Sequence, residues 1–457
     1  MYDLVIKNGL LVLPDRVLPG SLLIHNGKIA GLEPAVGAEN GGPDDAAQVV
    51  DASGCCVLPG AIDTHSHLND PGYTESEDFY TGTCSAAAGG FTSVLEMPIS
   101  LPVPASARLL AEKKALLEPK AVIDFGLWGG LIAGNQNELA AMADFGAVGV
   151  KGFLTEDPYY PPVNWGLIVS YLPRLAASGL PFALHCETPE VNQVCLEQLR
   201  AAGRRDPAAY PQSRPEISEI LAVSSFTTLA RHYPQARFYI VHSSVADSVE
   251  LALAARAQGA QVYVETCPHY LALDESDLDK YGPLAVCNPP LRSRAAQEKL
   301  WQRVLAGDID CIGSDHAPYL YEEKTRGDRD IWQTAPGFTG IQTCLPLFFD
   351  QAVNQRGLSL PQFAALTSAN AARIFGLYPQ KGSLEPGTDA DVTIIDPRRS
   401  WTVRKEQLFY KQPWSPFIGR QLNAAIRATV VRGRIVHEAG RILAAPGYGR
   451  FVKAVRG

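Results

Sequence analysis

The stretch Gly60-Ala61-Ile62-Asp63-Thr64-His65-Ser66-His67 closes an apolar run with two histidines that are separated by one residue. Side chains two residues apart in a β-strand point to the same side, so His65 and His67 can reach one ion while Ser66 faces elsewhere. A strand that ends in such groups is typical of a (β/α)₈ barrel, whose active sites lie at the C-terminal ends of its strands.

The middle of the chain repeats this pattern of a short apolar segment followed by an amphipathic one. The amphipathic segments are Ala105–Leu117, Trp165–Ala177, Glu216–His232 and Ala246–Gln258. The apolar segments, read as strands, are Val57–Ile62, Thr92–Met97, Val122–Leu127, Ala147–Phe153, Phe182–His185, Phe238–His242, Val262–Thr266 and Cys311–Ser314. Eight such units predict an α/β fold with a (β/α)₈ TIM barrel over residues 58–379. A doubly wound open sheet is the alternative, but no Gly-x-Gly-x-x-Gly follows the first strand.

Both ends of the chain are β-rich and differ in style from the middle. Strands are expected at Leu4–Ile6, Leu10–Leu13 and Leu22–Ile24, then at Ala390–Ile395, Ala428–Val431 and Ile435–His437. The expected turns are Lys7-Asn8-Gly9, Asn26-Gly27 and Arg432-Gly433-Arg434, and Gly37–Asp45 is expected to be a surface loop. We predict a small β-sandwich domain built from residues 1–57 and 380–457.

The bulk composition describes an ordinary globular protein. The 457 residues are 46% hydrophobic and 19% charged, and the net charge of −8 argues against a nucleic-acid partner. The start of the chain lacks the pattern of a signal peptide, and no apolar run approaches the ~20 residues of a membrane span. The nine cysteines form no Cys-x-x-Cys pair and are expected to be reduced thiols. These features predict a cytoplasmic protein without membrane partners.

Four further strand ends carry side chains suited to metal chemistry. They supply Lys151, His185, His242 and Asp315, which join His65 and His67 at one rim of the predicted barrel. Histidine and carboxylate are natural ligands for zinc and similar divalent ions, so the sequence predicts a metal site there. The remaining histidines are interpreted differently: His316 and His269 as hydrogen-bond partners of ligands, and His25, His232 and His437 as surface residues.

Lys151 has two interpretations. A protonated lysine repels a cation, so it can instead bind an anion or pair with a carboxylate. Alternatively, reaction with CO₂ converts it to a carbamate whose two oxygens bridge two metals. Composition does not decide between them.

The whole chain resembles the cyclic amidohydrolases, which include dihydroorotase, allantoinase, hydantoinase and dihydropyrimidinase. The motifs are PGAIDTHSH (59–67), DPGYTESEDFYTGT (70–83), GAVGVKGFL (146–154), LHCE (184–187), VHSS (241–244), ETCPHYL (265–271), NPPLR (288–292), GSDHAP (313–318) and KGSLEPGTDADVTIID (381–396). The resemblance implies two divalent metal ions, expected to be zinc. One is held by His65, His67, Lys151 and Asp315, and the other by a carbamylated Lys151, His185 and His242. It also implies a homo-oligomer, a tetramer by analogy.

The same resemblance implies that Asp315 is the catalytic residue. It would take the proton of a metal-activated water and pass it to the departing ring nitrogen. A relative that has kept the fold but lost catalysis is the non-enzyme alternative. Such a scaffold protein is expected to lack metal ligands, whereas all six ligand positions are filled here.

The substrate is expected to be a neutral, five-membered cyclic ureide. Dihydroorotases carry an arginine where Asn69 stands and an asparagine where Ile99 stands, and both grip the substrate carboxylate. Allantoin is placed slightly ahead of hydantoin, although allantoinases commonly have arginine in place of Tyr73. Dihydropyrimidines come next and dihydroorotate after them. The predicted substrate contacts are Asn69, Tyr73, Ser100, Asn288 and Gly337.

Two loops are expected to set selectivity. They are Leu154–Asn164, after the Lys151 strand, and Tyr319–Thr334, after the Asp315 strand. Packing of Tyr159 and Tyr160 in a subunit interface is an equal alternative for the first loop.

Overall fold

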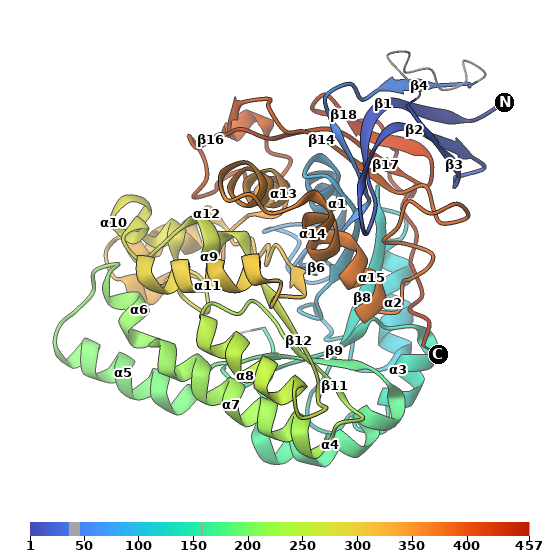
Figure 1. The fold of residues 1–457 in the computed structure, drawn as a ribbon. Coiled ribbons are helices and arrows are strands. Elements are labelled where there is room, and N and C mark those ends of the chain that lie inside the picture. Colours follow the sequence, from blue (N-terminus) through green and yellow to red (C-terminus); the bar gives the residue numbers. More distant parts are fainter. Residues whose placement is uncertain (36–45, 157–158, 457) are drawn as a thin grey trace.

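Eight parallel strands, joined in chain order, form the predicted barrel in a computed structural model that describes residues 1–35, 46–156 and 159–456 (Figure 1). A bridge between Ser66 and His316, and a hydrogen bond of 2.8 Å from His67 N to His316 O, bring the last strand against the first. The strands are β6 (Ala61–Ser66), β7 (Phe91–Glu96), β8 (Asp124–Gly130), β9 (Gly149–Phe153), β10 (Pro181–His185), β11 (Arg237–Ile240), β12 (Gln261–Thr266) and β13 (Cys311–Ile312).

Helices surround the barrel and connect its strands (Figure 1). The four predicted helical segments correspond to α2 (Ala107–Leu117), α4 (Trp165–Ser178), α7 (Glu216–His232) and α8 (Ala246–Arg256). Polar side chains begin several of them, since Ser106 and Asn164 accept hydrogen bonds from backbone N–H groups of α2 and α4. The other α-helices are α1 (Phe79–Ala88), α3 (Leu139–Phe145), α5 (Pro189–Ala201), α6 (Ala209–Ser213), α9 (Pro268–Ala272), α10 (Asp277–Tyr281), α11 (Arg294–Ala306), α12 (Tyr321–Thr325), α13 (Ile341–Phe349), α14 (Leu360–Ala364) and α15 (Asn370–Ile374).

The predicted first strand, Val57–Ile62, is wrong because Gly60 divides it. The residues before Gly60 form β5 (Cys56–Pro59) in a second sheet, and those after it begin β6 of the barrel. A Cβ at Gly60 would lie 2.3 Å from Thr92 Oγ1 and 2.7 Å from Asp391 Cβ, so the crossing from sheet to sheet requires glycine. A continuous apolar run does not reveal such a crossing.

The second sheet has nine strands and draws on both ends of the chain, as predicted. Its order is β19-β18-β17-β14-β5-β1-β2-β3, and β4 also pairs with β1. The bounds not yet given are β1 (Leu4–Val12), β2 (Val17–His25), β3 (Lys28–Pro34), β4 (Val49–Asp51), β14 (Val392–Asp396), β17 (Ala425–Val431), β18 (Arg434–Glu438) and β19 (Arg441–Ile442), while β15 (Trp401–Thr402) and β16 (Gln421–Leu422) pair separately.

Two of the three turns expected in these terminal segments are confirmed. Asn26-Gly27 joins β2 to β3 and Arg432-Gly433 joins β17 to β18, with φ positive at all four residues. Lys7-Asn8-Gly9 is a bulge inside β1 instead of a turn, so one half of β1 pairs with β4 and the other with β5. The predicted loop Gly37–Asp45 lies outside the described residues.

A buried charge cluster links the second sheet to the barrel. Lys381 Nζ lies 2.8, 3.3 and 2.5 Å from carboxylate oxygens of Asp124, Asp389 and Asp391. The ammonium group fills the space between the three acids, so the cluster is an ion network and not a metal site.

His437 is buried in β18, against which α1 packs, so its prediction as a surface residue is wrong. Burial lowers the pKa of His437 to about 4, which keeps the ring neutral.

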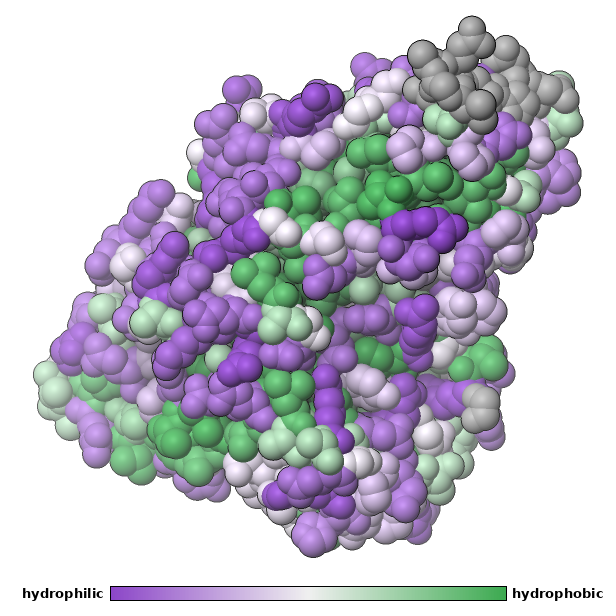
Figure 2. Space-filling view, in the orientation of Figure 1, coloured by the Kyte–Doolittle hydropathy of each residue, from purple (hydrophilic) through white to green (hydrophobic). Residues whose placement is uncertain are grey.

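Polar side chains dominate the face of the molecule shown in Figure 2, with the largest gathering of apolar side chains at the upper right. In the described part of the chain, no helix combines the length and apolarity needed to cross a bilayer. All nine cysteines are free thiols, as expected.

Candidate metal centre and substrate pocket

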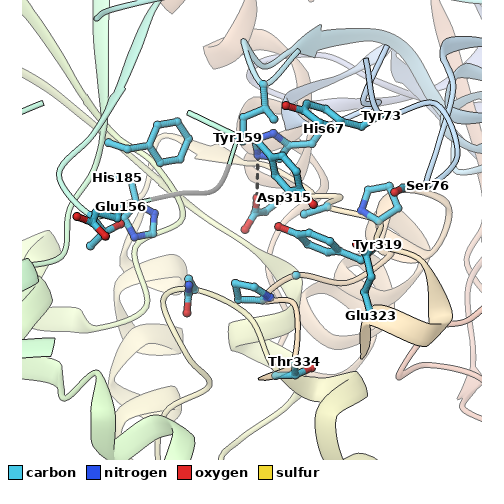
Figure 3. Close-up of a pocket in the computed structure, with 18 of the residues that line it drawn as sticks. His67, Tyr73, Ser76, Glu156, Tyr159, His185, Asp315, Tyr319, Glu323 and Thr334 are labelled. Atoms are coloured by element: carbon cyan, nitrogen blue, oxygen red, sulfur yellow. Dashed lines mark ion pairs between the residues drawn. The ribbon is translucent and has the colours of Figure 1, made fainter. Parts of the chain in front are cut away.

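A cavity of about 450 Å³ opens at the C-terminal ends of the barrel strands. Figure 3 shows His67, His185 and Asp315 facing it, with the rings of Tyr73, Tyr159 and Tyr319 nearby. Five of the six predicted ligands line it: His65, His67, His185, His242 and Asp315. The sixth, Lys151, is fully buried beside them in β9. The structure thus brings the ligands predicted from separate strands together.

Three of the candidate ligand atoms meet on one side of this centre. Asp315 Oδ1 lies 3.4 Å from His65 Nε2 and 3.6 Å from His67 Nε2. These distances are long for hydrogen bonds. They match atoms that share one ion, since tetrahedral zinc with bonds of about 2.0–2.1 Å separates its ligands by about 3.4 Å. This donor set fits a divalent metal.

A second pair of histidine nitrogens lies within hydrogen-bond distance of each other. His185 Nδ1 and His242 Nε2 are 3.0 Å apart. Close by, Lys151 Nζ is buried without a hydrogen-bond partner among the described residues and lies 4.7 Å from the centre of the Phe153 ring. A buried amine without a partner is costly. Conversion to a carbamate would give this position an anionic ligand.

Two buried glutamates fix which nitrogen of each histidine faces the centre. Glu265 Oε1 is 2.9 Å from His65 Nδ1, which leaves Nε2 toward Asp315. Glu187 Oε2 is 2.7 Å from His185 Nε2, which leaves Nδ1 toward His242. Such carboxylate–histidine pairs hold the tautomer and the ring orientation of metal ligands.

Further hydrogen bonds hold both glutamates. Glu265 accepts from Thr64 Oγ1 at 2.5 Å and Tyr239 OH at 2.9 Å, and Glu187 accepts from Arg214 at 2.5 Å. The roles of Glu265 and Glu187 were not predicted from the sequence. Their position in or next to strands that carry candidate metal ligands could have indicated these roles.

The electrostatics favour the protonation states that metal binding needs. Burial lowers the pKa of His65 and, more strongly, that of His242, so both rings are neutral near pH 7. Burial opposes ionisation of Asp315, but the facing His65 and His67 outweigh it and hold the pKa of Asp315 well below its usual range. Burial also lowers the pKa of Lys151 to about 8. About a tenth of this amine is therefore neutral at pH 7, far more than of an ordinary lysine, and can react with CO₂.

Strained backbone marks the same residues. His242 and Asp315 have φ of 38° and 45°, values that side chains other than glycine rarely adopt. Asp63 secures the second of these by accepting hydrogen bonds from Ser314 N at 2.8 Å and Ser314 Oγ at 2.6 Å. Such conformations cluster at functional sites.

Four of the five predicted substrate contacts line the cavity: Asn69, Tyr73, Asn288 and Gly337. Asn69 Nδ2 donates to Pro318 O at 3.1 Å, and Asn288 Oδ1 accepts from Tyr210 OH at 2.8 Å. Ser100 is not in the lining, because its hydroxyl turns to Pro102 O at 3.1 Å. Ile99 lines the cavity instead.

Both predicted selectivity loops contribute to the cavity, through Tyr159 from the first and Tyr319 from the second. Tyr160 is buried inside the chain and donates to Lys151 O at 2.8 Å, so it supports the end of β9 and is not exposed to another subunit. The outer lining by Leu196, Arg200, Tyr210 and Trp332 was not predicted from the sequence, because these residues come from helical segments that carry no recognisable motif.

The two histidines expected to support ligands differ in the structure. His316 accepts from His67 N through its carbonyl and from Gly340 N through Nδ1 at 3.1 Å. His269 Nε2 has no hydrogen-bond partner among the described residues.

The Amidohydrolase family model matches residues 56–436. The chain belongs to the amidohydrolase family. The allantoinase of Escherichia coli (strain SE11) is 35% identical over 444 residues, covering 96% of this chain and 95% of that protein.

Solved structures of this family agree with the fold. The L-hydantoinase (dihydropyrimidinase) from Arthrobacter aurescens superposes with a TM-score of 0.95 at 33% identity, covering 99% of this chain and all of that one. The dihydropyrimidinase from Brevibacillus agri NCHU1002 has a TM-score of 0.91 at 31% identity, with 99% of each chain covered. The predicted enzyme class is confirmed: this amidohydrolase is a hydrolase of cyclic amides.

Replacement of Glu265 by glutamine tests how this amidohydrolase orients His65. The variant should lose about 10- to 100-fold in kcat/KM and in zinc affinity, because a neutral amide holds the Nδ1–H of His65 more weakly than a carboxylate does. Steady-state kinetics and competition with a zinc indicator measure both quantities. The control is Glu112→Gln, an exposed residue of α2 that lies outside the cavity lining. Unchanged zinc affinity in Glu265→Gln would contradict the assigned role.

Proposed function

We propose that this amidohydrolase is a binuclear, metal-dependent enzyme that opens the ring of a small neutral cyclic ureide, with allantoin ahead of hydantoin. The observation that supports it best is the meeting of two donor sets at the base of one cavity. His65, His67, Asp315 and Lys151 would hold one divalent ion, expected to be zinc. Lys151, as a carbamate, would join His185 and His242 on the other.

Bound divalent ions would make a water molecule acidic near neutral pH and polarise the ring carbonyl. The chain's own contribution centres on Asp315. Its Oδ1 faces His65 and His67, which leaves Oδ2 to accept a proton from the attacking water. The same oxygen then donates the proton to the departing ring nitrogen, so that a base becomes an acid within one cycle.

The lining supports a neutral ring. Asn69 and Ile99 occupy the positions where relatives that bind a substrate carboxylate carry an arginine and an asparagine. The Asn69 amide already donates to Pro318 O. A substrate carboxylate buried at this wall would lack the hydrogen-bond donors that an arginine and an asparagine supply, and burying an unpaired charge is unfavourable. Dihydroorotate is therefore the weakest candidate.

The tyrosines support hydantoins as the second candidate. The rings of Tyr73 and Tyr159 lie 4.3 Å apart and those of Tyr159 and Tyr319 6.5 Å apart, which gives the cavity an aromatic wall. Such a wall suits an apolar ring substituent as well as the planar ureido group of allantoin.

A substrate panel tests the proposal. Zinc-loaded enzyme is incubated with allantoin, hydantoin, dihydrouracil and dihydroorotate, and kcat/KM is compared. We expect a five-membered ureide to rank first, activity to be lost on chelation, and about two ions per chain to restore it. Faster turnover of dihydroorotate would overturn the interpretation of Asn69 and Ile99, and full activity after complete metal removal would overturn the metal mechanism.

A further inference from the structure

Lys324 is a fully buried lysine next to the lining of the cavity, and it is not part of the candidate metal centre. It belongs to α12, and its Nζ donates to three backbone carbonyls: Val286 O at 2.9 Å, Ala335 O at 2.7 Å and Gly337 O at 2.8 Å. No carboxylate of the described residues lies within ion-pair distance. Burial lowers the pKa of Lys324 to about 7, whereas three carbonyl acceptors match the three N–H groups of the ammonium and favour the charged form.

Lys324 and its three carbonyl partners belong to three segments that together form one side of the cavity, here called the pocket wall: residues 286–288, 319–325 and 334–337. Asn288, Tyr319, Leu320, Glu323, Thr334, Pro336 and Gly337 of this wall line the cavity. No strand pairing joins the segments, although His316 bridges to Phe338 just beyond them. Lys324 is their common attachment point.

Other contacts at the same place depend on this arrangement. Val286 O accepts from Gly337 N at 3.0 Å as well as from Lys324 Nζ, and Lys324 O accepts from Thr334 Oγ1 at 3.1 Å. The Lys324 ammonium also lies 5.5 Å from the centre of the Trp414 ring. Loss of the ammonium would remove the Lys324 donor from Ala335 O and Gly337 O and would leave Val286 O with Gly337 N alone, which is unfavourable for buried carbonyl groups.

We infer that Lys324 is a positioning residue for substrate binding: its ammonium fixes the spacing between Asn288 and Gly337 and so sets how the cyclic amide is held against Asp315. The inference rests on the proposed hydrolysis of a cyclic ureide. Lys324 touches neither the reacting atoms nor a metal ligand. Its effect therefore falls on binding that the ground and transition states share, which changes KM and leaves kcat nearly constant.

The test compares Lys324→Met with wild type on the best substrate of the panel. We expect KM to rise about tenfold, kcat to stay within about threefold, and metal content to be unchanged. Lys324→Arg keeps the charge and should recover part of the KM. Lys280→Met, which removes an exposed lysine, is the matched control and should behave as wild type.

A second readout does not depend on activity. Amide hydrogen exchange in residues 319–337 should accelerate in Lys324→Met and remain unchanged in Lys280→Met. An unchanged KM in a folded Lys324→Met, a fall confined to kcat, or a loss of metal would each overturn the inference. Failure of both Lys324 variants to fold would assign the residue to stability alone. Absence of turnover by wild type would instead refute the proposed function.

Discussion

Replacing Lys151 by alanine is expected to lower kcat/KM by about 10³-fold or more and to reduce the metal content from about two ions per chain to one or fewer. The reason is the position of this amine, buried beside His185, His242 and Asp315 with no hydrogen-bond partner among the described residues. Without a bridging anion, the centre loses the several kcal/mol that metal chemistry supplies, and each 1.36 kcal/mol is a factor of ten in rate. Elemental analysis and steady-state kinetics measure the two effects.

Two controls separate the carbamate from simple loss of packing. Lys151→Met keeps most of the side-chain volume, so it should lose metal and activity as completely as alanine does. Metal-free wild type should regain activity with zinc only when bicarbonate is present, and ¹³C-bicarbonate should give a carbamate signal in the carbon NMR spectrum. Full activity in either variant, or reactivation in CO₂-free buffer, would refute the carbamate.

The barrel was predictable because its signal is repeated. Eight apolar segments with helices between them leave few alternatives, and six side chains suited to metal binding lie at strand ends and pointed to one rim. The wrong predictions concern segments whose local sequence is compatible with two different structures. Positive φ at Asn8 suits a bulge as well as a turn, and the run around Gly60 carries no mark of the change of sheet.

The supporting groups of the site could not be predicted in the same way. Glu265 and Glu187 look like ordinary polar residues near strand ends, and only the fold places them against His65 and His185. Lys324 lies in a connecting segment whose path depends on three backbone carbonyls from distant positions. Candidate ligands can be predicted from sequence because strands have a regular period of two residues. The walls of a pocket depend on loop conformation, which has no such period.

Asp315→Asn should lower kcat by about 10³-fold while KM changes much less. Asparagine keeps the shape and one oxygen donor but neither accepts nor delivers a proton, and proton transfer by a placed group contributes about 10²- to 10⁴-fold. Because the pKa of Asp315 is held well below its usual range, the wild-type carboxylate stays ionised into acid, and protonation of Asp315 should limit kcat only below that range. Kinetics at saturating zinc, with metal content measured on the same samples, provide the check.

The control for this variant is Asp308→Asn. Asp308 precedes β13, whereas Asp315 follows it, and the Asp308 carboxylate lies 3.4 Å from Arg303. Asp308→Asn should retain wild-type kcat, since the start of a barrel strand faces away from the cavity. If Asp315→Asn keeps both metal ions and a kcat within about tenfold of wild type, another group moves the proton. In the described lining only Glu75, Glu156 and Glu323 remain as carboxylates to replace it, and none of them faces His65 and His67 as Asp315 does. If Asp315→Asn instead keeps its metal but has a low kcat, the result would show that Asp315 transfers a proton in addition to any role in metal binding.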